Sequence, residues 1–259
     1  MPIMVMHTGN VTVIAPPGRI LQQVAADIMI GITEKIRNQT TLHVGAHALE
    51  RSEMAGLAVG IQTEQMFDEN GKKLWNAFNT RQLHRMVSRF DAILDLSHAN
   101  APAYSDLPID QQRKVRFGPY IFPEFIPQFV GGSGTPVFYG TPTNRRKKIL
   151  RTLVSRGKIS MIPRGTFGED LAQMIASAPA VVNIHIDEGV YTEYPRLLNA
   201  YLNGKVIISE RLAGPLVAGK HYADIMSTFD SSTASEIYRN FSNFAQQHKV
   251  SSFLIDATS

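Results

Sequence analysis

The sequence predicts an α/β fold made of two domains in which parallel strands alternate with helices. Short apolar and β-branched runs, each the length of a buried strand, recur along the chain. Amphipathic helical patterns follow most of these runs. A stretch rich in Gly, Ser and Pro at residues 127–136 interrupts the alternation. We therefore expect domains at residues 1–133 and 134–259 with a cleft between them.

The most complete strand–helix–strand unit spans residues 180–209. Residues 180–186 and 205–209 are apolar runs typical of core strands, Pro195 suits a first helical position, and Gly204 suits a C-terminal cap. The loop after a parallel strand lies at the carboxyl edge of the sheet, where doubly wound folds bind ligands. We expect a polar site at this edge, although an ordinary solvated loop is the alternative for any one residue. Its members are His185, Asp187, Glu188, Glu193 and Arg196.

The first domain contains further strand and helix patterns. Strands are predicted at residues 11–15, 42–46, 57–61 and 91–96, and helices at residues 20–36 and 72–87. In the second helix the predicted core contacts are Trp75, Phe78, Leu83 and Met86. The turn at residues 16–19 has no GxGxxG pattern, which disfavours a dinucleotide-dependent dehydrogenase.

The second domain starts a new cycle beyond the glycine-rich stretch. Strands are predicted at residues 137–139, 159–162 and 225–229, and helices at residues 145–155, 167–176 and 233–248; the last ten residues carry no clear pattern. Four cations, residues 145–148, stand at a helix N-terminus, where they oppose the helix dipole unless an anion lies opposite. A phosphate would supply that anion, and a solvated basic face is the alternative.

Composition limits the class of protein. With 44% hydrophobic and 19% charged residues the chain is typical of a globular protein, and no apolar run approaches the roughly 20 residues of a membrane span. Its start lacks the pattern of a signal peptide, so we expect a cytoplasmic location.

The absence of cysteine excludes disulfides and thiolate nucleophiles, and the eight histidines lack metal-ligand spacing. We expect no metal and no cofactor. A net charge of +4 is compatible with phosphate ligands, a membrane surface or nucleic acid.

Four stretches of the second half resemble the donor-binding domain of GT-B glycosyltransferases. They are VFYGTPTNRRKKIL (137–150), IPRGTF (162–167), LAQMIASAPAVVNIHI (171–186) and YPRLLNAYLNGKVIISE (194–210). In the first half, IQTEQ (61–65) and DAILDLSHAN (91–100) look like a bacterial polysaccharide branch of that group. The resemblance implies two Rossmann-like domains and metal-independent transfer of a sugar from a nucleotide-sugar to a glycan, a polysaccharide precursor or a lipid-linked acceptor.

The resemblance also implies roles for individual residues. Arg145 and Arg146 would meet the diphosphate, since a guanidinium binds such a group bidentately. The family's ribose-binding carboxylate falls at Asn199 here, so that Glu193 or Glu210 would replace it. The whole implied donor-binding set is Gly140, Arg145, Arg146, Arg164, His185, Glu188, Glu193, Arg196, Asn199 and Glu210.

On the acceptor side, Gly18 and Arg19 are candidate binding residues. If the reaction inverts the anomeric centre, a general base is needed. Glu64 and His98 are the catalytic candidates for this base. They rank ahead of Asp95, which we expect to be a buried structural carboxylate.

Two alternatives remain open. One is a nucleotide-sugar epimerase or hydrolase of the same fold. The other is a nucleic-acid-binding or DNA-modifying protein that uses Arg113, Lys114, Arg116 and the cations at 145–148. Peripheral membrane association and the oligomeric state are also left open.

Overall fold

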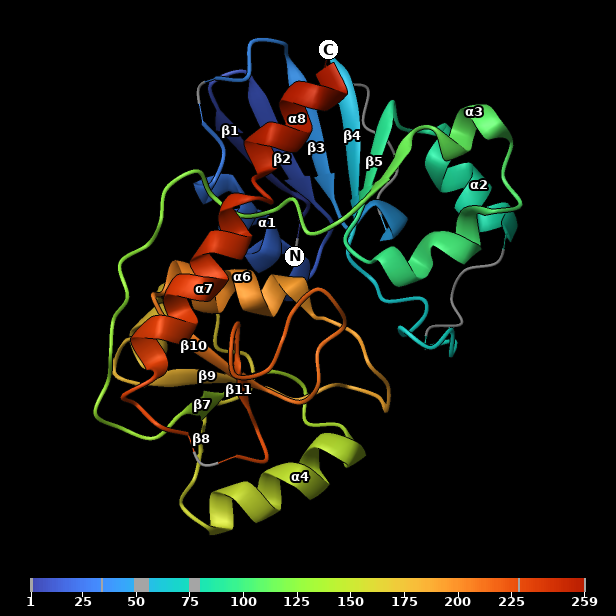
Figure 1. Cartoon of the computed structure of the whole chain (residues 1–259). Coiled ribbons are helices and arrows are strands. Elements are labelled where there is room, and N and C mark those ends of the chain that lie inside the picture. Colours follow the sequence, from blue (N-terminus) through green and yellow to red (C-terminus); the bar gives the residue numbers. More distant parts are fainter. Residues whose placement is uncertain (1, 34, 49–55, 75–79, 228, 259) are drawn as a thin grey trace. The chain divides into compact units, whose positions relative to one another are not determined.

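The computed structural model describes residues 2–33, 35–48, 56–74, 80–227 and 229–258 (Figure 1). The chain forms two compact units. Unit 1 contains Met1–Phe125 and Ala245–Ser259, and unit 2 is Ile126–Phe244. Each unit has a largely parallel sheet with helices, which confirms the mixed α/β class. None of the described helices has the length and apolar character needed to cross a membrane.

The division of the chain differs from the boundary expected at 133/134, chiefly at the C-terminus. The last helix, α8 (Val250–Thr258), belongs to unit 1. Backbone hydrogen bonds join Phe122 N to His248 O (3.2 Å) and Val250 N to Phe122 O (3.0 Å). Phe253 and Leu254 of α8 are buried. Because these contacts link segments far apart in the sequence, no local pattern in the last residues could reveal them.

Unit 1 is built on a six-stranded sheet whose strands lie side by side in chain order. Strands β2 to β6 are parallel, and β1 pairs antiparallel with β2 through a tight turn that contains Gly9 (φ 53°). Strands β2 and β3 are buried along their whole length. For β2 the apolar run predicted this, whereas β3 starts at Thr40, two residues before the strand predicted at 42–46. The strands are β1 (Met4–Thr8), β2 (Val11–Ala15), β3 (Thr40–Val44), β4 (Leu57–Gln62), β5 (Ala92–Asp95) and β6 (Val115–Phe117).

The helices of unit 1 are shorter than the periodic patterns suggested. They are α1 (Arg19–Ile30), η1 (Ala46–Ala48), α2 (Thr80–Ser88), η2 (His98–Tyr104) and α3 (Ile109–Gln112). The helix predicted over 20–36 ends at Gly31, where a Cβ would lie 2.9 Å from Pro123 Cα, yet Ile32 and Ile36 are still buried. Leu83 and Met86 are buried, as predicted. Trp75 and Phe78 lie outside the described residues.

Unit 2 has a five-stranded parallel sheet in the order β11-β10-β9-β7-β8. Counted along the chain from β7, this is the order 2-1-3-4-5 of a doubly wound sheet. The chain moves from β7 to β8 on one side and then crosses to β9 on the other, so the order reverses between β7 and β9. Such a switch point opens a crevice at the carboxyl ends of the strands. The strands are β7 (Val137–Phe138), β8 (Ser160–Met161), β9 (Ala180–Asn183), β10 (Val206–Ser209) and β11 (Ala223–Asp224).

The strand predicted at residues 225–229 is wrong in position, because β11 ends at Asp224. There the Asp224 carboxylate accepts a hydrogen bond from Met226 N (2.7 Å), and Asp224 O accepts one from Ser227 N (3.1 Å), which turns the chain away from the sheet.

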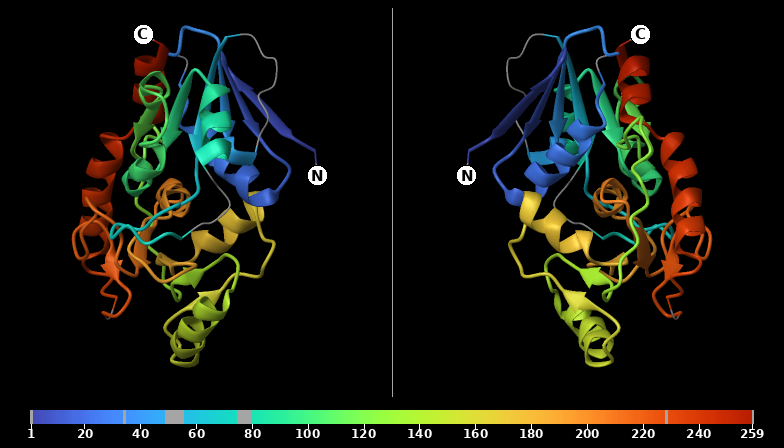
Figure 2. Two further views of the ribbon diagram at one scale, coloured as in Figure 1. Left: turned by 90° about the vertical axis from the view of Figure 1, so that its right-hand side faces the viewer. Right: turned by 90° about the vertical axis from the view of Figure 1, so that its left-hand side faces the viewer.

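Four helices accompany the sheet of unit 2. They are α4 (Asn144–Ser155), α5 (Gly168–Ala176), α6 (Tyr194–Leu202) and α7 (Ala234–Gln246). Tyr201 of α6 and Tyr238 of α7 stack at 5.6 Å between ring centroids. Gly204 follows α6 with φ +68°, and a Cβ there would lie 2.1 Å from Gln128 O, so this position requires glycine. Both views of Figure 2, like Figure 1, show α4 on the β8 side of the sheet.

Candidate functional site

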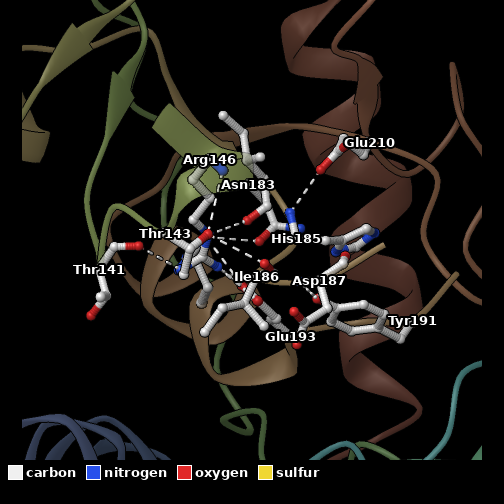
Figure 3. Close-up of polar contacts among 12 residues, drawn as sticks. Thr141, Thr143, Arg146, Asn183, His185, Ile186, Asp187, Tyr191, Glu193 and Glu210 are labelled. Atoms are coloured by element: carbon white, nitrogen blue, oxygen red, sulfur yellow. Dashed lines mark hydrogen bonds and ion pairs between the residues drawn. The ribbon is translucent and has the colours of Figure 1, made fainter. Parts of the chain in front are cut away.

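The switch point of unit 2 gathers charged and polar side chains from four segments (Figure 3). Arg145 and Arg146 stand in the first turn of α4, directly after the loop that follows β7. His185 follows β9, Glu193 is the N-cap residue of α6, and Glu210 follows β10. The carboxyl ends of three neighbouring parallel strands therefore bring these residues to one edge of the sheet.

Arg145 forms a two-pronged ion pair with Glu210. Its Nη1 donates to Glu210 Oε2 (2.9 Å) and to His185 O (2.9 Å), and its Nη2 donates to Glu210 Oε1 (2.5 Å). Glu210 Oε2 also accepts from His185 N (2.7 Å). Burial alone would raise the pKa of Glu210, but the hydrogen bonds from Arg145 and His185 hold this pKa below its usual value. The Arg145 side chain keeps 25% of its surface exposed, so solvent still reaches it.

Arg146 is held much more deeply, because each of its three guanidinium nitrogens donates to an oxygen of the protein. Its Nε donates to Ile184 O (2.8 Å), its Nη1 to Thr141 O (3.2 Å) and its Nη2 to both oxygens of Glu193 (2.8 and 3.1 Å). Only 3% of the side chain is exposed. Burial lowers the pKa of Arg146, and the charge of Glu193 partly offsets that shift.

Arg196 completes this second ion-pair group. Its Nη1 lies 3.1 Å from Glu193 Oε2 and 3.0 Å from Asn183 Oδ1. The guanidinium groups of Arg196 and Arg146 lie 5.5 and 5.7 Å from the Phe138 ring centroid. Gly140 has φ +125°, and a Cβ there would lie 2.9 Å from Arg196 Nη2. Glycine at position 140 thus lets the backbone pass beside the cation.

His185 is buried and stacked on Tyr191, with 4.2 Å between ring centroids. Its Nε2 lies 2.9 Å from Arg211 O, and because a carbonyl can only accept, Nε2 carries the proton. Its Nδ1 is buried and has no hydrogen-bond partner among the described residues. Burial lowers the pKa of His185, so the ring is neutral near pH 7 and Nδ1 is available as an acceptor.

The remaining residues of the predicted donor set lie around this cluster. Glu188 is exposed, and its negative charge helps to raise the pKa of Arg145, after the larger effect of the Glu210 hydrogen bond. Asn199 is buried and accepts a hydrogen bond from Tyr139 OH (3.0 Å). Arg164 is exposed in the loop after β8, and within the described part of the chain it forms no ion pair.

Charge at this edge is mixed. The guanidinium groups of Arg145, Arg146 and Arg196 face the carboxylates of Glu193 and Glu210, which leaves one net positive charge within the ion-paired set. The exposed residues Asp187 and Glu188 in the loop after β9 add two negative charges beside it. The N-termini of α4 and α6 add the positive ends of two helix dipoles. The arrangement can bind a phosphate or carboxylate through Arg145 and can accept hydrogen bonds from hydroxyl groups through Glu210.

In unit 1 the sheet's carboxyl edge contains a separate polar network centred on Asp95. This carboxylate is fully buried, as expected, and accepts hydrogen bonds from Tyr104 OH (2.7 Å), Asn100 Nδ2 (2.9 Å) and Ser97 N (2.9 Å). Burial raises the pKa of Asp95 to about 7, although these hydrogen bonds oppose the shift. Asn100 also donates to Glu64 O (2.9 Å). Asp95 thus fixes the segment that carries Glu64.

The two candidate bases of unit 1 lie near this network. Glu64 has 41% of its side chain exposed, and its Oε1 lies 3.8 Å from His47 Nε2. The other ring nitrogen of His47, Nδ1, lies 2.8 Å from Gln62 Oε1. His98 is exposed at the start of η2, and its ring is tilted against Phe117 at 6.1 Å.

The predicted acceptor-binding pair lies at the start of α1. Gly18 is the N-cap residue of this helix with φ 136°, and Arg19 is its exposed first residue.

Several site residues escape sequence reasoning. Tyr191 contacts His185 only because the loop after β9 folds back on itself, which no spacing indicates. His47 and Gln62 are 15 positions apart in the sequence, so no local spacing indicates the hydrogen bond between their side chains. Asn183 and Thr143 did carry signals. Asn183 is a polar residue inside an apolar strand, and its Nδ2 donates a hydrogen bond to Ser209 Oγ. Thr143 precedes a helix, and its side chain caps α4 by accepting a hydrogen bond from Arg146 N (3.3 Å).

Comparisons with known proteins find similarity of structure only. No protein-family model and no curated protein matches the chain. Among solved structures, the glycosylation-associated Gap123 complex of Streptococcus agalactiae is similar over 84% of this chain and 51% of its own (9% identity, TM-score 0.39). A variant of S. aureus TarM in complex with fondaparinux, α-GlcNAc-glycerol and UDP is similar over 90% and 57% (8% identity, TM-score 0.42).

AviGT4, a glycosyltransferase of avilamycin A biosynthesis, is similar over 92% of this chain and 88% of its own (12% identity, TM-score 0.43). The chain spans about half the length of the first two structures. These TM-scores are too low to carry an argument about function, so the function has to be inferred from the residues of the candidate site.

Proposed function

We propose that the protein is a glycosyltransferase that moves a sugar from a nucleotide-sugar donor to a hydroxyl acceptor. In this proposal the two units are Rossmann-like domains of the GT-B type, with the donor on unit 2 and the acceptor on unit 1. The observation that carries the proposal is the convergence of Arg145, His185, Glu193 and Glu210 at the switch point of the unit 2 sheet, beside two helix N-termini. That edge suits a diphosphate joined to hydroxyl-bearing rings.

The two adjacent arginines have different roles in this proposal. Arg145 is one-quarter exposed and already binds a planar anion, the Glu210 carboxylate, with two parallel hydrogen bonds. It would bind the diphosphate and offset the charge that develops on the leaving nucleotide. Arg146 is buried and saturated by Glu193 and two carbonyls, so it acts as a positioning residue.

The ribose is assigned to Glu210 rather than to Asn199. Asn199 is buried and uses its Oδ1 for Tyr139 OH, whereas Glu210 remains partly exposed beside Arg145. When a phosphate shares Arg145, the Glu210 carboxylate becomes available to accept hydrogen bonds from ribose hydroxyls.

The transfer step would be a displacement at the anomeric carbon of the donor sugar. The acceptor oxygen attacks the anomeric carbon, the bond from that carbon to the diphosphate oxygen breaks, and the nucleoside diphosphate leaves with the electron pair. A carboxylate or imidazole of unit 1, Glu64 or His98, would take the acceptor proton if the reaction inverts the anomeric centre. No metal is required in this scheme, because Arg145 and the helix N-termini supply positive charge.

Nucleotide binding is the first property to test. In thermal-shift screening with nucleotides and nucleotide-sugars, a ligand at about 100 times its Kd should stabilise the protein by about 2.7 kcal/mol. We expect Arg145→Ala to abolish that shift and Arg113→Ala, which removes an exposed cation of unit 1, to leave it intact. Equal effects of the two variants would contradict the assigned pocket, and no shift with any nucleotide would remove the main support for the enzyme.

Nucleotide binding is expected of an epimerase or hydrolase of the same fold as well as of a transferase, so a second experiment has to distinguish these enzyme classes. Product analysis with and without an acceptor does this, because a transferase makes a new glycoside only when the acceptor is present.

A further inference from the structure

The first half of unit 2 has an unusual distribution of charge along the chain. Between Glu124 and Glu169 the sequence contains eight cations and no carboxylate. Two of them, Arg145 and Arg146, are neutralised by Glu210 and Glu193 at the candidate site. The others have no acidic neighbour in sequence.

Five of the remaining cations form what we call the basic face: Lys147, Lys148, Arg151, Arg156 and Lys158. The first three share one side of α4, since they are spaced by one, three and four residues. The other two follow the end of this helix. All five are exposed, and within the described part of the chain none of them lies within ion-pair distance of a carboxylate.

Local stability does not explain this arrangement. Lys147 lies at the end of the first turn of α4, where the helix dipole disfavours cations, and Lys148 follows it. Lys147 and Arg151 are four residues apart and repel each other across one helical turn. A surface that is unfavourable for the isolated helix fits a function in which anions lie against it.

Apolar side chains are exposed beside the basic face. Val154 lies on α4 three residues after Arg151 and seven after Lys147, which places it along the edge of the same face, and it is 42% exposed. Met161 of the edge strand β8 follows Lys158 by three residues and is 47% exposed, at a hollow that Met174 of α5 also lines. Cations next to exposed apolar groups are typical of surfaces that lie in the headgroup region of a membrane.

We propose that the basic face binds the surface of an anionic lipid bilayer, with the five cations near the headgroups and Val154 and Met161 entering the boundary of the acyl chains. Lipid is favoured over nucleic acid because the exposed apolar groups here are aliphatic. A nucleic-acid surface would instead use aromatic rings to stack on bases. This inference does not depend on the proposed glycosyltransferase activity.

The test is sedimentation of the full-length protein with vesicles of phosphatidylcholine, with and without about 30% phosphatidylserine. We expect binding only to the anionic vesicles, and weaker binding when the salt concentration rises from about 0.05 to about 0.5 M. The triple variant Lys147→Gln/Lys148→Gln/Arg151→Gln should lose about 100-fold in affinity, because each cation near the surface contributes about fivefold. The pair Val154→Ser/Met161→Ser should weaken the binding that persists at high salt.

The matched control removes the same charge elsewhere. Arg37→Gln/Arg81→Gln/Arg85→Gln neutralises three exposed cations of unit 1 and should keep vesicle binding. Circular dichroism establishes that every variant is folded. The proposal is overturned if the wild-type protein ignores anionic vesicles, if both triple variants lose binding equally, or if duplex DNA is bound through the same three residues while vesicles are not.

Discussion

Replacing Arg146 with Met is expected to destabilise the protein by about 3 kcal/mol, because removing one partner of a buried ion pair is costly even though Glu193 keeps its contact with Arg196. Glu193 would lose two hydrogen bonds, and the carbonyls of Ile184 and Thr141 would each lose one. Met has a similar length and is apolar, so the change removes the charge with little loss of volume. Urea unfolding followed by circular dichroism measures the effect.

A matched control comes from the same helix. Arg151→Met removes an exposed arginine and should change the free energy of unfolding by less than about 0.5 kcal/mol. The double variant Arg146→Met/Glu193→Gln should not recover the loss, since Arg196 then lies beside Phe138 without its carboxylate partner. If Arg146→Met were as stable as Arg151→Met, the buried ion pair would not hold this edge of unit 2 together.

The second large effect concerns the dependence of stability on pH, through Asp95. The pKa of this carboxyl group is about 7 in the folded protein and ordinarily 3.8, so the folded state binds the proton more tightly. Its contribution to stability is therefore complete below about pH 4 and is lost as the pH rises through about 7. Because each tenfold change in proton affinity corresponds to about 1.4 kcal/mol, the free energy of unfolding changes by at most about 4 kcal/mol.

The variant Asp95→Asn, which cannot titrate, isolates this contribution. Wild type should be the more stable protein at about pH 5, and its advantage over Asp95→Asn should shrink or reverse at about pH 8. Urea unfolding followed by tryptophan fluorescence is suitable, because the single tryptophan, Trp75, belongs to the sequence of unit 1. A constant difference between the two proteins from about pH 5 to about pH 8 would show that Asp95 does not titrate in this range.

Much of the fold could be predicted because its central elements carry strong local signals. Strands β2, β9 and β10 are buried throughout and consist largely of apolar residues. Elements whose existence depends on distant partners carry no such signal. The half-buried edge strand β1 is held only by β2, and α8 packs where the chain returns to Phe122.

The candidate site was predictable to a similar depth. Strand–loop–helix order placed His185 and Glu193 at one edge of a sheet, and the family resemblance added Arg145. In the structure Arg145 donates to His185 O, and its neighbour Arg146 donates to Glu193. The pairing of each arginine with its carboxylate could not be predicted. Arg145 and Arg146 are adjacent in sequence and equally basic, yet one is reachable by solvent and the other is enclosed, because neighbouring positions on a helix point about 100° apart.

The assignment of α8 to unit 1 has a consequence for how the chain can be divided. Unit 2 is a single continuous insert, Ile126–Phe244, between two pieces of unit 1. A gene fragment can therefore encode unit 2 whole, whereas every fragment that stops before Ala245 deprives unit 1 of its closing helix. Joining Phe125 to Ala245 through a short linker is the way to express unit 1 by itself.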